Sequence, residues 1–147
     1  MKRPSLSRRI PETIEVGRVI SFRRTLTDGD VSLFIGATWD VNPLHTDDVY
    51  AEGTDFGRRI VPGLLTASLL THLGGLWAFM ATRMELTFLA PVFVGDTILA
   101  EAKIVDYEPE RGWVRLECSC VNREGEVVLR GNVDGYPGID IQESSEG

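Results

Sequence analysis

Residues 39–48, WDVNPLHTDD, place a carboxylate and an imidazole five positions apart, at Asp40 and His45. Asn42 and Pro43 lie between them, and an Asn-Pro pair favours a turn. Taken alone, the segment is a polar loop. A turn that brought both side chains to one side would place an acid–base pair there.

The longest apolar stretch of the chain begins about twenty residues after this pair. Pro62 suits the first turn of a helix, because its missing N–H loses no hydrogen bond there. Leucines then occupy nearly every face from Gly63 to Met80, which predicts a buried helix. Its N-terminus offers unpaired N–H groups and a partial positive charge, which suit a developing oxyanion.

The elements around this helix predict an α+β fold. A strand is expected over 19–25, and a short helix over 31–37 begins with Thr27 as its cap and Asp30 in a capping box. After the long helix the apolar period falls from 3.6 to 2, which predicts strands at 84–88, 97–108, 113–122 and 126–133. We therefore expect an antiparallel sheet wrapped around one long buried helix.

One sheet and one helix leave a sheet edge and a helix flank open, so we expect a homodimer or a larger homo-oligomer built of dimers. The single domain is predicted to span residues 14–134. A flexible segment is expected at 1–13 and a flexible acidic tail at 135–147.

The net charge of −7 argues against nucleic acid or an anionic membrane as the main partner. Cys118 and Cys120 share one face of a predicted strand, where disulfide geometry is poor, so two reduced thiols are expected. Two cysteines and two histidines in scattered places do not predict a metal site. The absence of a signal-peptide pattern and of a membrane span predicts a cytoplasmic protein.

Three motifs carry a resemblance to a known family: DVNPLHTDDVYA at 40–51, FGRRIVPG at 56–63 and LAPVFVGDTI at 89–98. They resemble the MaoC-like dehydratases, the (R)-specific enoyl-CoA hydratases of the hot-dog fold, over about residues 15–134. The resemblance implies reversible syn addition of water to a trans-2-enoyl-CoA, which gives an (R)-3-hydroxyacyl-CoA. It implies no metal or redox cofactor, since CoA is part of the substrate.

The resemblance also implies roles for individual residues. Asp40 is the base that takes a proton from water, and His45 orients that water and supplies a proton to the α-carbon. The amide of Gly63 polarises the thioester carbonyl, and Ser68 helps to hold the catalytic groups. Burial alone would favour a neutral Asp40, so we expect hydrogen bonds from Asn42 or from loop amides to keep it ionised.

The sequence departs from the family pattern at two positions. Trp39 stands where the family usually has glycine, and Pro62 stands where a histidine is common. Trp39 either narrows the acyl pocket or faces away and packs in the core, and Trp39, Trp77 and Phe79 as a group suggest a restricted pocket without indicating which of them faces it. Four basic residues could meet the CoA phosphates or be surface charges, namely Arg58, Arg59, Arg83 and Lys103, and His72 is interpreted as a structural histidine of the buried helix.

Two other functions stay open. A hot-dog thioesterase typically uses an acidic residue on or beside the central helix, whereas residues 63–80 contain no Asp or Glu. A non-catalytic acyl-CoA-binding subunit of a heteromeric dehydratase would tend to lack Asp40 or His45, and both are present.

Overall fold

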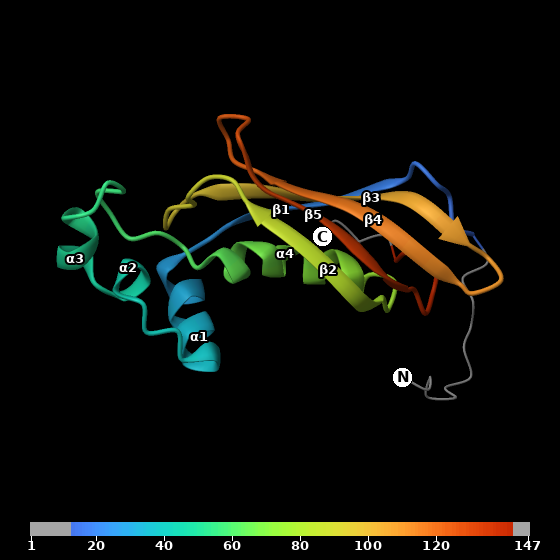
Figure 1. The fold of residues 1–147 in the computed structure, drawn as a ribbon, viewed down its shortest axis with the longest axis horizontal. Coiled ribbons are helices and arrows are strands. Elements are labelled where there is room, and N and C mark those ends of the chain that lie inside the picture. The colour runs from blue at the N-terminus through green and yellow to red at the C-terminus, as the bar shows by residue number, and fades with distance from the viewer. Residues whose placement is uncertain (1–12, 143–147) are drawn as a thin grey trace.

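The computed structural model describes residues 13–142. A five-stranded antiparallel sheet in the order β1-β3-β4-β5-β2 curves over one helix, α4 (Figure 1). The α+β hot-dog architecture expected from the sequence is confirmed. The elements are β1 Val19–Thr25, α1 Asp28–Thr38, α2 Pro43–Thr46, α3 Asp48–Glu52, α4 Gly63–Gly75, β2 Met80–Phe88, β3 Thr97–Glu108, β4 Trp113–Val121 and β5 Val127–Tyr136.

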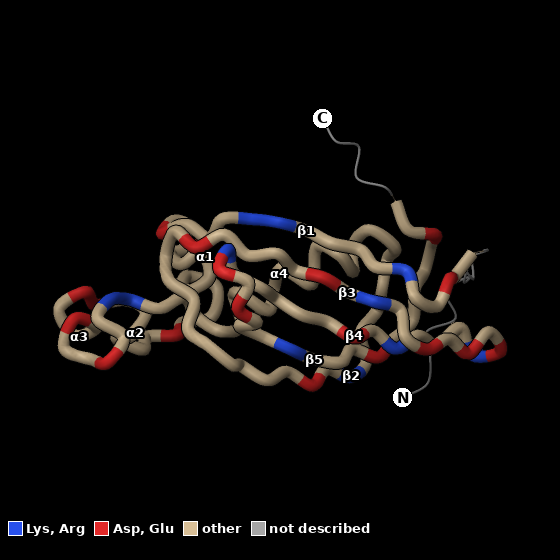
Figure 2. Tube along the Cα trace, turned by 90° about the horizontal axis from the view of Figure 1, so that it is seen from above, with Lys and Arg blue, Asp and Glu red and all other residues tan. Residues whose placement is uncertain are grey.

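The strands alternate between a buried face and a face toward solvent, as their sequence period of 2 predicts. On β3 the inward side chains are Ile98, Ala100, Ala102 and Ile104, all essentially buried. Both edges of the sheet are formed by the strands that flank the helical segment, β1 and β2. Lys and Arg are spread over the strands and the loops rather than gathered in one basic patch (Figure 2), and none lies on α1–α4.

The predicted tail at 135–147 is partly wrong. β5 continues to Tyr136, and beyond it the amide of Gln142 donates to the carbonyl of Leu76 at 2.7 Å. This segment therefore packs against the end of α4, because backbone groups there supply partners that the sequence pattern does not reveal. The rest of that tail, 143–147, and residues 1–12 of the predicted N-terminal segment lie outside the described residues.

Helix α4 is shorter and less enclosed than its apolar sequence predicts. It ends at Gly75 rather than near Met80, because two successive glycines weaken a helix and the Phe79 amide turns back to the Gly74 carbonyl. Five of its side chains are buried toward the sheet, namely Thr66, Ala67, Leu69, Leu70 and Leu73. The opposite side is exposed in the single chain, and His72 lies there, stacked on Phe22 at a centroid distance of 3.9 Å.

The segment between β1 and α4 carries three short helices, and α2 and α3 project beyond the end of the sheet (Figure 1). Helix α1 begins with the predicted capping box of Thr27 and Asp30. No helix within residues 13–142 is long and apolar enough to cross a membrane.

Candidate active site

The loop from α1 to α2 brings Asp40 and His45 together. Helix α1 ends at Thr38, and its C-cap residue, Trp39, takes the left-handed conformation with φ 57°. Asn42 then caps α2, and its side-chain oxygen accepts a hydrogen bond from the Leu44 amide at 3.0 Å. The resulting turn leaves Asp40 Oδ2 3.7 Å from His45 Nε2.

A hydrogen bond fixes the orientation of the His45 ring. Nδ1 lies 2.8 Å from the carbonyl oxygen of Ile60, and because a carbonyl only accepts, Nδ1 carries a hydrogen. Nε2 is therefore the ring nitrogen that faces Asp40. His45 is 8% exposed, so its neighbours hold the ring in place.

Asp40 is held by one loop amide, since the amide of Asn42 donates to Asp40 Oδ1 at 3.2 Å. The side chain of Asn42 is engaged in capping α2, so its part in the site is to shape the turn.

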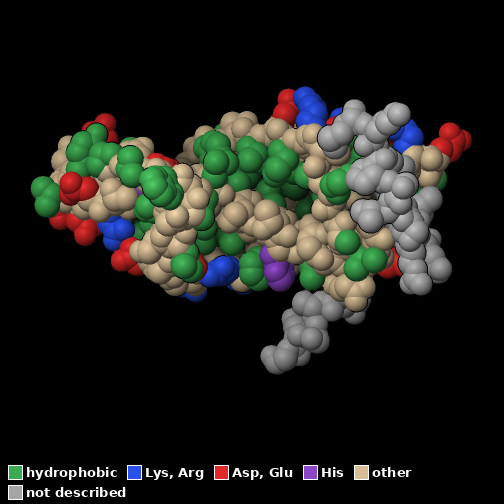
Figure 3. All heavy atoms as spheres, turned by 90° about the horizontal axis from the view of Figure 1, so that it is seen from below, with side chains coloured by type: hydrophobic (Ala, Val, Ile, Leu, Met, Phe, Trp, Pro, Cys, Tyr) green, Lys and Arg blue, Asp and Glu red, His purple; other side chains and the backbone are tan. Residues whose placement is uncertain are grey.

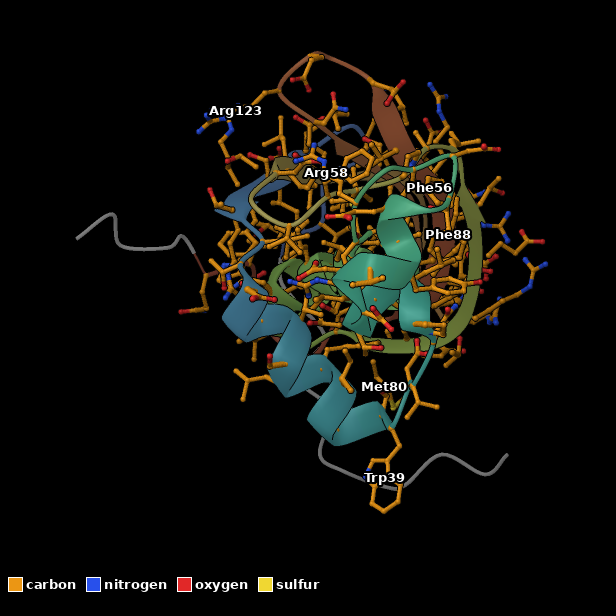
Figure 4. The ribbon with its side chains drawn as sticks, turned by 90° about the vertical axis from the view of Figure 1, so that its left-hand side faces the viewer. Trp39, Phe56, Arg58, Met80, Phe88 and Arg123 are labelled. Carbon is orange, nitrogen blue, oxygen red and sulfur yellow. The ribbon has the colours of Figure 1, made fainter. Side chains whose placement is uncertain are left out.

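Asp40 and His45 line a cleft of about 500 Å³, a size usual for small-molecule sites. Its other walls come from the start of α4 and from residues 88–92. Phe56 and Phe88 border the cleft, with Arg58 to their left in this view, whereas Trp39 points away into solvent (Figure 4). The cleft is thus mainly apolar, with the acid and the imidazole at one position on its wall.

Gly63 opens α4 and lines the same cleft. Pro62 precedes it, and no side chain caps the helix start. A Cβ at position 63 would lie 2.7 Å from the ring of Phe88, so glycine is needed for close packing as well. The helix N-terminus and the acid–imidazole pair therefore face one space, which is the arrangement expected from the sequence.

Ser68 does not line this cleft. Its hydroxyl donates to the Leu65 carbonyl at 2.5 Å. Five residues along an α-helix correspond to a rotation of about 140°, which turns Ser68 away from the face of Gly63. Its predicted role in holding the catalytic groups remains without a contact that would support it.

Thr66 is a cleft residue that the sequence analysis missed. It lies three positions after Gly63, and residues three apart share a helix face. That spacing is the signal that could have identified it.

Arg59 is also missed as a positioning residue, although its charge was noted. Its guanidinium donates to Asp48 at 2.6 Å, to Asp28 at 3.0 Å and to the carbonyl of His45 at 3.3 Å. Hydrogen bonds to Asp28 and Asp48 raise the pKa of Arg59 above its ordinary value. One side chain thus ties α1 and α3 to the backbone of the histidine.

The aromatic residues predicted to restrict the pocket do not do so. Trp39 is 82% exposed, and Trp77 is fully buried and stacked on Phe79 beyond the far end of α4. Aromatic side chains from other segments take that place, namely Phe34, Phe56 and Phe88. They were missed because their distance along the chain hides their proximity in the fold.

Of the four basic residues considered for CoA phosphates, Arg58 and Arg59 lie at the cleft end of the molecule. The guanidinium of Arg58 stacks over Phe93 at 4.0 Å, next to the cleft wall. Arg59 donates to two acids and to the His45 carbonyl, as described above. Arg83 pairs with Glu85 at 3.0 Å. Lys103 lies on β3, on the face that lacks α4.

Comparison with known proteins was made by sequence and by structure. The model of the MaoC like domain family matches residues 11–118. An (R)-specific enoyl-CoA hydratase of Rhodospirillum rubrum is 34% identical over 125 residues, which cover 82% of this chain and 85% of that protein. A 3-hydroxybutyryl-CoA dehydratase of Methylorubrum extorquens is 37% identical over 125 residues, which cover 82% and 78%.

The fold is matched by solved structures. The (R)-hydratase of A. caviae involved in PHA biosynthesis superposes with a TM-score of 0.82 at 28% identity, over 86% of this chain and 98% of that chain. The unliganded R-hydratase PhaJ1 of Pseudomonas aeruginosa superposes with a TM-score of 0.80 at 26% identity, over 86% and 84%.

Proposed function

The chain belongs to the MaoC-like domain family, and we propose that it is an (R)-specific enoyl-CoA hydratase, which also runs in reverse as a 3-hydroxyacyl-CoA dehydratase. The observation that carries the proposal is the pair of Asp40 and His45, 3.7 Å apart in an apolar cleft at the start of α4. Hydration of an enoyl thioester needs a base, an acid and a stabilised carbonyl oxygen at one place, and these groups supply all three.

In the hydration direction, Asp40 takes a proton from water as the water oxygen bonds to the β-carbon. The π electrons of the double bond move toward the thioester, so negative charge develops on its carbonyl oxygen. His45 then gives the proton of Nε2 to the α-carbon. Because acid and base lie on one wall, both parts of water add to the same face of the alkene.

The hydrogen bond to Ile60 defines the protonation state that this step requires. Nδ1 keeps its hydrogen throughout, so His45 donates from Nε2 only as the imidazolium. Hydration begins with ionised Asp40 and imidazolium His45, and dehydration begins with protonated Asp40 and neutral His45. Both forms hold one transferable proton, so both directions need the same total protonation of the pair.

Gly63 supplies the carbonyl-stabilising group in this mechanism. Its N–H belongs to the first turn of α4, where amides point out of the helix and the dipole favours negative charge. Loss of one such donor typically lowers kcat about 10²–10³-fold. We also propose that no metal or redox cofactor takes part, because the chain itself supplies acid, base and donor. Dialysis against EDTA should leave kcat unchanged.

The proposal is tested with purified protein and crotonyl-CoA, by the loss of the enoyl absorbance. Asp40→Asn should abolish hydration without changing the melting temperature, and the matched control Asp55→Asn, an exposed acid outside the cleft, should retain it. The product should resist an (S)-specific 3-hydroxyacyl-CoA dehydrogenase. An active Asp40→Asn variant would refute the mechanism.

The same assay separates the other two functions. Release of free thiol from acyl-CoA with the enoyl absorbance unchanged would identify a thioesterase. Tight acyl-CoA binding without turnover by the pure homo-oligomer would identify a non-catalytic binding subunit.

We further propose a homodimer that forms along the β2 edge and the exposed side of α4. Met80, Met84 and Phe88 on β2 are exposed in the single chain, and hydrophobic side chains gather on the side where β2 and α4 lie (Figure 3). Sedimentation should give a dimer for the wild type and a monomer for Met84→Glu. A monomeric wild type would contradict this assembly. We propose a cytoplasmic location, with which two buried free thiols are consistent.

A further inference from the structure

Thr66 carries an unusual hydroxyl. Within residues 13–142, two buried side-chain polar atoms have no hydrogen-bond partner, Thr66 Oγ1 and Trp77 Nε1. Thr66 is 2% exposed and borders the cleft that contains Asp40 and His45. A buried hydroxyl without a partner is unfavourable, so its retention at the cleft needs an explanation.

The described residues give the Thr66 hydroxyl no hydrogen-bond partner. A helical threonine commonly donates to the carbonyl four residues earlier, which here belongs to Pro62. That carbonyl already accepts from the amides of Leu65 at 2.9 Å and Thr66 at 3.3 Å, and Oγ1 makes no bond to it. Bulk solvent does not reach the atom either. A group bound in the cleft would give the hydroxyl a partner.

The helix geometry indicates where that partner lies. Each Cα–Cβ bond of an α-helix tilts toward the N-terminus, so the side chain of Thr66 leans over the turn that contains Gly63. Position 63 has no side chain of its own, and its amide belongs to the open end of the same turn. The Thr66 hydroxyl and the Gly63 N–H are therefore two donors on one face of α4.

We propose that the Thr66 hydroxyl is a second oxyanion donor, which together with the Gly63 amide binds the carbonyl oxygen of the acyl thioester. The inference rests on the proposed hydratase function and adds a side chain to its site. Thr66 Oγ1–H donates to the oxygen as charge develops there. The hydroxyl gains the partner that it lacks in the free protein when the substrate binds.

The test compares Thr66→Val, which keeps the shape and removes the hydroxyl, with Thr66→Ser, which keeps the hydroxyl. Thr66→Val should lower kcat about 10²-fold and change KM by less than about threefold, since the donor acts mainly in the transition state. Thr66→Ser should stay within about fivefold of the wild type. The control Ser119→Ala, which removes a hydroxyl on the face of β4 that lacks α4, should keep wild-type kcat.

Stability distinguishes this role from a structural one. Removal of an unpartnered buried hydroxyl should leave the melting temperature of Thr66→Val equal to or above that of the wild type. A variant that is as stable as the wild type but slow supports the proposal. A Thr66→Val variant with wild-type kcat overturns it.

A vibrational measurement tests the contact directly. The wild type should shift the carbonyl stretch of bound, carbonyl-labelled butyryl-CoA to lower frequency than in water, and Thr66→Val should lose part of that shift. An unchanged band in a slow variant overturns the oxyanion assignment and points to the attacking water as the partner. A wild type that hydrates no enoyl-CoA overturns the proposed function and this inference together, whereas an active wild type with an equally active Thr66→Val overturns the inference alone.

Discussion

Replacement of Arg59 by glutamine is expected to lower kcat about tenfold while the protein stays folded. Arg59 does not line the cleft, but it donates to the backbone carbonyl of His45 and to acids on the helices on either side, α1 and α3. Its loss should let α2 leave the position in which His45 Nε2 faces Asp40. The expected defect is one of positioning, so kcat should fall more than the affinity for substrate.

The magnitude follows from the exposure of the partners. The side chain of Arg59 is 18% exposed, but those of Asp28 and Asp48 are 64% and 75% exposed. Each of these ion pairs is therefore worth only about 0.5 kcal/mol. A charged donor on the His45 carbonyl adds about 1 kcal/mol, which brings the whole to about 2 kcal/mol. Glutamine restores part of this stabilisation. The remaining local loss of about 1.4 kcal/mol corresponds to a tenfold fall in kcat.

The assay measures kcat and KM for crotonyl-CoA together with the urea midpoint. Arg59→Lys should fall between wild type and Arg59→Gln, because lysine keeps the charge but loses the fork that spans two acids. Arg23→Gln, an exposed arginine on β1, is the matched control and should retain wild-type kcat. A folded Arg59→Gln variant with kcat within about twofold of wild type would refute the reasoning.

Three further outcomes are expected. The Arg115 guanidinium, 2.7 and 2.9 Å from the two Asp134 oxygens, holds the pKa of Asp134 below its ordinary value. This pair stabilises the fold fully above about pH 4 and less as the pH falls through the lowered pKa of Asp134. In urea unfolding, Arg115→Met should therefore lower the free energy of unfolding by about 1 kcal/mol at pH 7 and by less at pH 2. An equal loss at both pH values would contradict this. Burial raises the pKa of Cys118 to about 12 and that of Cys120 to about 11, so mass spectrometry should find neither alkylated by iodoacetamide at about pH 8 in the native protein, and rapid native labelling would disagree. Gly63→Ala should displace the ring packed 2.7 Å from the added Cβ and lower kcat/KM about tenfold; unchanged kinetics in a folded variant would argue against that packing.

Regular periodicity made the sheet predictable. The expected strands at 19–25 and 97–108 coincide with β1 and β3, since alternating apolar residues and clear turn residues mark them in the sequence itself. The end of α4 was not predictable in the same way. Apolar residues continue past Gly75, and the chain leaves the helix because two glycines and a backbone hydrogen bond from Phe79 favour a turn there.

In the candidate site, too, the residues with a local sequence signal were predictable and the others were not. Asp40, His45 and Gly63 stand in motifs whose spacing is local, so the sequence alone indicated them and the structure brings them to one cleft. Thr66 has a local signal in its distance from Gly63, but its importance depends on a missing partner, which only coordinates reveal. Phe88 comes from a strand more than forty residues after Asp40, and no local pattern connects the two.

The path of the chain between β1 and β2 has a consequence for folding. β3, β4 and β5 are joined by short turns and pair with their sequence neighbours, whereas β1 and β2 lie on opposite edges and close long loops. The central hairpins are therefore expected to form first, and the edge strands with the intervening segment to dock later. All the proposed reacting groups belong to that segment, so native-state hydrogen exchange should show them opening at lower free energy than β4, without the central hairpins coming apart.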